Sequence, residues 1–180
     1  MTSHRTAAHA LAGISALVLT VGFLSGCTPE PDPTPTPTAA FASEEEAFAA
    51  AEEVYRAYTE AVNLERDGDD SVDPLGFLVG EALDGSLDTS NKLQSQELRI
   101  VGDSFVLAFT GQSADFPNGE GATVTALVCL DVSSTAVLDS SDSDVTPSDR
   151  AGHVPLDVKF IDSGDGLRIS QSELAEAAAC

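Results

Sequence analysis

The chain has 180 residues, of which 30 are Asp or Glu and 8 are Lys or Arg, so its formal net charge at pH 7 is −22. A surface this acidic repels nucleic acids and anionic lipid headgroups, because the phosphate attraction that drives such binding has the wrong sign. Nucleic-acid binding is therefore excluded, and the length allows one ordinary domain with additional segments.

The N-terminal residues have the parts of an export signal. Arg5 lies in a weakly basic beginning, and residues 10–24 form an almost unbroken apolar run. The run ends in Leu24-Ser25-Gly26-Cys27, which resembles the lipobox of bacterial lipoproteins of the actinobacterial type. A retained transmembrane helix is the alternative, but a spanning helix needs about 20 apolar residues, so this run is at the short limit.

The lipobox resemblance implies an address and an anchor. In that family the cysteine thiol receives diacylglycerol and the chain is cut before it, so residues 1–26 are a removed signal peptide and Cys27 becomes the first residue. Two or more acyl chains, such as palmitate, hold a protein stably on a bilayer. The resemblance therefore implies a lipoprotein at the outer face of the cell membrane, exposed at the cell surface. The abundance of Ala, Asp and Gly and the scarcity of Lys also favour an actinobacterial host.

A proline-rich spacer follows, over residues 27–41. Proline occupies alternate positions from 29 to 37, which favours a semi-rigid polyproline II segment. At about 3.1 Å per residue, this segment can hold a domain roughly 40 Å from the bilayer.

A long helix is predicted next. Ser43 and Glu46 form a capping box, and the helix is expected to end near Arg66, ahead of Asp67-Gly68. Apolar residues recur at helical spacing on one face, which is typical of a buried stripe: Phe48, Ala51, Val54, Tyr55, Tyr58 and Val62.

A short second helix is expected over 74–83. After it, apolar and polar residues alternate, which is the pattern of strands. Two hairpins are predicted, one with strands 97–101 and 104–110 around Gly102-Asp103, the other with strands 154–161 and 167–170. Between them, residues 122–132 read as a long strand, with one face formed by Val124, Ala126, Val128, Leu130 and Val132. A final helix is expected over 173–179.

This order of elements predicts a single α+β domain over residues 42–180, with a long N-terminal helix and a short second helix packed on a curved antiparallel sheet of four or more strands. The element order over residues 42–172 resembles the cone-shaped NTF2-like fold. That fold encloses a pocket in enzymes, ligand binders and structural modules alike, so it does not select a function.

Three cysteines occur in the chain. If Cys27 carries lipid, Cys129 and Cys180 remain in a compartment where disulfides persist, and the simplest expectation is that they pair. The alternative is two free thiols.

No catalytic set is recognisable in the sequence. Beyond the signal only His153 can serve as an imidazole base, and Ser113, in GQSAD, lacks the second glycine of a nucleophile elbow. NTF2-like enzymes often place an Asp with a His, Tyr or Arg inside the cone. The residues available for such a set, each with a simpler structural role, are Tyr55, Tyr58, Arg99 and Asp131.

Metal and cofactor sites are not expected. An EF-hand loop needs Gly at position 6 and Glu at position 12, but a loop that starts at Asp67 has Val72 and Leu78 there. Weak cation binding by the acidic loop is left open, through Asp67, Asp69, Asp70 and Asp73. A single histidine argues against zinc, and no glycine-rich phosphate loop occurs.

The sequence therefore favours a non-catalytic binding or interaction module, which takes an unknown protein or small-molecule ligand. One alternative is a small enzyme of the cyclase or isomerase type in the same fold. Another is an assembly or immunity factor of the cell envelope.

Overall fold

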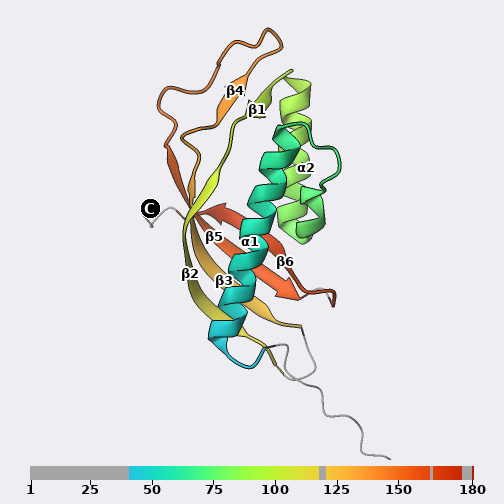
Figure 1. Cartoon of the computed structure of the whole chain (residues 1–180), viewed down its shortest axis with the longest axis vertical. Helices are drawn as coiled ribbons and strands as arrows, with labels where there is room; N and C mark the ends of the chain where they lie inside the picture. The colour runs from blue at the N-terminus through green and yellow to red at the C-terminus, as the bar shows by residue number, and fades with distance from the viewer. Residues whose placement is uncertain (1–40, 118–120, 163, 176–179) are drawn as a thin grey trace, which may run out of the picture. The chain divides into compact units, whose positions relative to one another are not determined.

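The computed structural model describes residues 41–117, 121–162, 164–175 and 180 (Figure 1). The predicted signal peptide, Cys27 and the proline-rich spacer up to residue 40 lie outside these residues. The described elements, in chain order, are α1 (Glu44–Arg66), the 3-10 helix η1 (Pro74–Phe77), α2 (Gly80–Ser95), β1 (Arg99–Val101), β2 (Phe105–Asp115), β3 (Thr123–Asp131), β4 (Ala136–Leu138), β5 (His153–Asp162) and β6 (Leu167–Leu174). Within the described part of the chain, no helix has the length and apolarity that crossing a membrane requires.

The fold is α+β, as predicted. Four strands form an antiparallel sheet in the order β2-β3-β5-β6, and α1 packs against one face of it (Figure 1). Alternation along β3 sends Val124, Ala126 and Val128 to the face that α1 covers, and all three are fully buried. The predicted face of this strand is therefore confirmed for these three residues and for Leu130, which packs partly buried against the same core. Val132 lies beyond the end of the strand.

Helix α1 begins and ends where the sequence predicts. The Ser43 hydroxyl accepts a hydrogen bond from the Glu46 amide at 3.2 Å, and the Glu46 carboxylate accepts one from the Ala42 amide at 2.8 Å. These bonds satisfy two amides at the helix entrance. Three glutamates in the first turn, Glu44 to Glu46, also place negative charge at the positive end of the helix dipole, which stabilises the helix.

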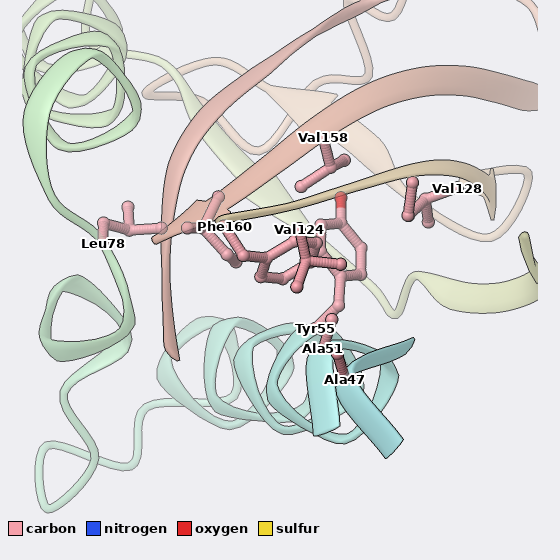
Figure 2. Close-up of a cluster of buried hydrophobic side chains, with 10 residues drawn as sticks. Ala47, Ala51, Tyr55, Leu78, Val124, Val128, Val158 and Phe160 are labelled. Carbon is pink, nitrogen blue, oxygen red and sulfur yellow. The ribbon is translucent and has the colours of Figure 1, made fainter. Parts of the chain in front are cut away.

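The core lies between α1 and the sheet, and aromatic rings occupy its centre. Tyr55 extends from α1 toward Val124 and Val158 of the sheet (Figure 2). Its ring centroid is 6.3 Å from that of Phe160 on β5. The ring centroid of Phe109 on β2 is 6.2 Å from that of Phe160. Phe160 is completely buried, so these rings bind the helix to the sheet.

The first predicted hairpin is wrong. Strand β1 pairs with β4, with Ile100 opposite Val137, in a separate two-stranded ribbon. The backbone at Gly102 has φ of +81°, and a Cβ there would lie 2.2 Å from the Ser134 carbonyl oxygen. Gly102 thus permits a close crossing of two chain segments, not a tight turn between adjacent strands.

The short second helix predicted over 74–83 is wrong in extent. Helix η1 ends at Phe77, and Leu78 then forms a parallel bridge with Ile169 of β6. The Val79 amide donates to the Ile169 carbonyl at 2.9 Å. This pairing interrupts the helical segment, and α2 begins afterwards and continues to Ser95.

The second predicted hairpin is confirmed, because β5 and β6 pair directly across residues 162–167. Strand β6 continues to Leu174, which is opposite Leu156. The helix predicted from Glu173 is therefore wrong at its beginning, and its residues 176–179 lie outside the described residues.

Candidate functional site

A groove of about 850 Å³ opens between the C-terminal half of α1, η1, α2 and β1, with β6 at its base. It forms because the two helices pack on different strands: α1 packs chiefly on β2, and α2 chiefly on β6. The larger apolar side chains of its lining are Val62, Leu75, Leu78, Leu93, Leu98, Ile100 and Ile169.

Helix α2 forms one wall of this groove with small side chains. None of its residues is buried, and the positions that line the groove include Ala82, Gly85, Ser86 and Ser90. Short side chains on this wall leave the space between the helices unfilled. The first turn of α2 is fastened to β6 by a hydrogen bond of 2.6 Å from the Gln171 amide to the Glu81 carboxylate.

Arg66, the last residue of α1, brings a positive charge to the groove. Its Nη1 donates to the Gly102 carbonyl at 3.4 Å and to the Ser104 hydroxyl at 3.5 Å. Burial lowers the pKa of the Arg66 guanidinium, while nearby Tyr58, Asp103 and Glu65 act in the opposite direction. An arginine keeps its proton at any physiological pH, so the groove contains a partly desolvated cation.

The two tyrosines considered from the sequence have different places. Tyr58 lines the groove, and burial raises the pKa of its hydroxyl, partly offset by Arg66. Tyr55 lies in the core, where burial raises the pKa of its hydroxyl further, and the nearby side chain of Ser172 acts in the opposite direction. Both hydroxyls therefore stay protonated near neutral pH.

The other residues considered for catalysis lie elsewhere. Asp131 and His153 are cross-strand partners on β3 and β5, and His153 Nε2 is 4.0 Å from Asp131 Oδ1. Hydrogen bonds from Ser133 lower the pKa of Asp131, with a smaller contribution from His153. Neither residue lines the groove. Arg99 is at the rim of the groove and forms an ion pair with Asp142.

Ser113 is far from the histidine. Its hydroxyl hydrogen-bonds to that of Thr125 at 2.7 Å, and these two residues are opposite each other on β2 and β3. Thr125 is six positions along β3 from Asp131, the partner of His153, a separation of roughly 20 Å at strand spacing. These side chains do not form a nucleophile–base pair.

The acidic loop after α1 is organised by local hydrogen bonds. The Asp69 carboxylate accepts from the Ser71 amide at 2.9 Å and from the Ser71 hydroxyl at 2.6 Å, and these bonds lower the pKa of Asp69. Among the described residues, no three or more His, Cys, Asp or Glu side chains are grouped so that they can hold a metal ion.

The structure joins Cys129 and Cys180 by a disulfide, with 5.4 Å between the two Cα atoms. This separation is compatible with the pairing predicted from the sequence. Cys129 alternates with Val128, so it lies on the sheet face opposite α1. On the way to Cys180, the Ala175 amide donates to the Pro155 carbonyl at 3.0 Å, which holds the end of β6 beside β5.

Sequence reasoning missed Arg66 as a site residue, although a signal was available. Tyr58, Val62 and Arg66 follow one another at intervals of four, so Arg66 continues the apolar stripe of α1 and lies on the same face. A cation at the end of such a stripe indicates a charge held against apolar surface.

Neither a protein-family model nor a curated protein sequence matches this chain. Among solved structures, the chain is similar to the intermembrane space region of the chloroplast protein ARC6, with a TM-score of 0.51 and 18% sequence identity. The match covers 71% of this chain and 95% of that chain. A likeness at this identity shows the fold alone, and it agrees with the α+β architecture.

Proposed function

We propose that this protein is a membrane-anchored extracytoplasmic lipoprotein whose single α+β domain, residues 42–180, is a non-catalytic binding module. Its ligand occupies the groove between α1 and α2. The observation that carries the proposal is the groove itself: about 850 Å³, with an apolar base and a lining in which apolar side chains alternate with polar and charged ones. Ligand sites in proteins usually have volumes of about 300–1,000 Å³, and they combine apolar surface with polar groups that orient the ligand.

The shape of the domain supports an NTF2-like arrangement as part of this proposal. A long helix lies across an antiparallel sheet, and the interrupted segment Leu78–Val79 joins the sheet at β6. Helix α1, helix α2 and strand β6 of the sheet together surround the groove on several sides. In a cone of this kind, the sheet is curved and the pocket opens at one end.

The anchor is proposed from the sequence. The lipobox places the lipid on Cys27, and the proline-rich spacer holds the domain away from the bilayer. The paired cysteines in the structure support an oxidising compartment, because disulfides persist outside the cytosol.

Filling the groove is expected to abolish binding. In Ser90→Phe, a ring projects from α2 into space that the hydroxymethyl group of Ser90 now leaves open. We expect the affinity for a neutral apolar probe, 1-naphthylacetamide, to fall at least tenfold. Naphthyl fluorescence reports the binding cleanly, because the chain contains no Trp.

Asn91→Phe is the matched control, since Asn91 is the next residue of α2 and does not line the groove. It is expected to keep the affinity of the parent protein. Equal affinities in the two variants, or no binding of the probe by the parent, would contradict the proposed function.

Replacing Cys27 by alanine is expected to release the protein from the membrane. Without the thiol no lipid is attached, and the described domain has no membrane-spanning helix to replace it. Fractionation of cells that express Cys27→Ala, with Thr28→Ala as the control that keeps the anchor, measures this. Tight membrane retention of Cys27→Ala would refute the lipoprotein assignment.

A further inference from the structure

We propose that the groove binds an amphiphilic organic anion, a small molecule with an aliphatic or aromatic body and a carboxylate group, and that Arg66 holds the carboxylate. This inference rests on the proposed function and adds the chemical class of the ligand. It excludes cationic and neutral molecules of the same shape as preferred ligands.

The distribution of charge in the groove supports an anion. Four charged residues line it: Glu65, Arg66, Glu81 and Arg99. Only Arg66 among them is partly buried, while the other three are exposed. Glu81 is also engaged by Gln171, and Arg99 by Asp142. The one charge that the apolar interior of the groove meets is therefore positive.

The hydrogen bonding of Arg66 leaves donors for a ligand. Both of its bonds come from Nη1, at 3.4 and 3.5 Å, which is beyond the usual range for N–H to O bonds. Among the described residues, Nε and Nη2 of Arg66 have no hydrogen-bond partner. A guanidinium offers five N–H donors in a planar fork that matches a carboxylate through two parallel bonds.

The free-energy cost of the partly buried charge on Arg66 also favours an anionic ligand. Arg66 is desolvated enough for burial to lower its pKa, and a desolvated charge is costly unless it is paired. Asp103 and Glu65 act on Arg66 electrostatically, but among the described residues no carboxylate forms an ion pair with it. A carboxylate that arrives in the groove supplies that direct partner. The strongly acidic surface elsewhere repels anions, so only a molecule that gains this pairing overcomes the repulsion.

The rest of the groove accepts the apolar body of the ligand. Leu78 and Ile169 form its buried base, and Leu93 and Leu98 line it at the end of α2 and the segment before β1. The small residues of α2 leave room above this base. An apolar group buried here gains roughly 25 cal/mol for each Å² removed from water.

Three matched probes test the inference: 1-naphthylacetate, 1-naphthylacetamide and 1-naphthylmethylamine, which carry a negative, a neutral and a positive group on the same ring system. Binding is measured by naphthyl fluorescence with the full-length lipoprotein in phosphatidylcholine nanodiscs, and empty nanodiscs are the reference. We expect the acetate to bind at least tenfold more tightly than the acetamide, and the amine to bind weakest.

Arg66→Gln is expected to lower the affinity for the acetate at least tenfold and to leave the affinity for the acetamide unchanged, which also shows that the groove is intact. Arg66→Lys is expected to retain a reduced preference, because it keeps the charge but loses the planar fork. Arg56→Gln is the matched control: Arg56 lies on the same helix and donates to the Val106 carbonyl, outside the groove.

Equal binding of the three probes, tighter binding of the amine, or an unchanged preference in Arg66→Gln would overturn the inference while the groove remains a binding site. Failure of all three probes to bind would overturn the proposed function along with it.

Discussion

Replacing Phe160 by alanine is expected to lower the free energy of unfolding by about 3–5 kcal/mol, the usual cost of removing a buried phenylalanine ring. Phe160 is completely buried and lies against Tyr55 of α1 and Phe109 of β2. Its loss leaves a cavity where the helix meets the sheet. Denaturant unfolding followed by far-UV circular dichroism measures the change.

Phe105→Ala is the control for this prediction. Phe105 is a phenylalanine of β2 with 51% of its surface exposed, and surface substitutions usually change stability by less than about 0.5 kcal/mol. Similar losses in both variants would contradict the core described above.

Removing the disulfide is expected to cost about 4 kcal/mol, the chain-entropy value for a cross-link between residues separated by 51 positions. The double variant Cys129→Ala and Cys180→Ala therefore unfolds at a lower denaturant concentration than the oxidised protein. Since small domains are stable by only about 5–15 kcal/mol, this is a large fraction of the total.

Two measurements make the disulfide prediction specific. Reductant is expected to destabilise the parent protein and to leave the double variant unchanged. Intact mass after thiol labelling, without reductant, is expected to show no label on Cys129 or Cys180 in exported protein. Labelling of both would establish free thiols and refute the predicted pair.

Much of the fold can be predicted because strong local signals agree with it. The cap at Ser43, the stripe of α1 and the alternation of β3 each depend on neighbouring residues, and the structure preserves all three. The turn between β5 and β6 has the same local character. The signal peptide and the lipid on Cys27 remain predictions from the sequence.

The elements that were predicted wrongly depend on distant partners. Strand β1 has three residues, and it pairs with β4 from a segment rich in Ser and Asp. No local pattern marks that pairing. Helix α2 contains Gly85, Thr89 and Ser90, which are weak helix formers, and only the pairing of Leu78 with β6 defines where it begins.

The candidate site was hidden for a related reason. Its residues come from α1, η1, α2, β1 and β6, and a groove exists only because two helices pack on different strands. Arg66 reads as an ordinary helix-terminal arginine, where a positive charge favours the helix dipole. Its partial burial follows from Gly102 and Ser104, which belong to a chain segment more than thirty-five residues later.

Helix α2 contributes no fully buried side chain, and this has a consequence for motion. Segments with few buried apolar contacts open at a small fraction of the global unfolding free energy. The central rings of Tyr55 and Phe160 are held between α1 and the sheet, so α2 can separate transiently without exposing them to solvent. This wall of the groove is thus expected to open more readily than α1 and the sheet, and the amides of α2 are expected to exchange with solvent faster than those of α1.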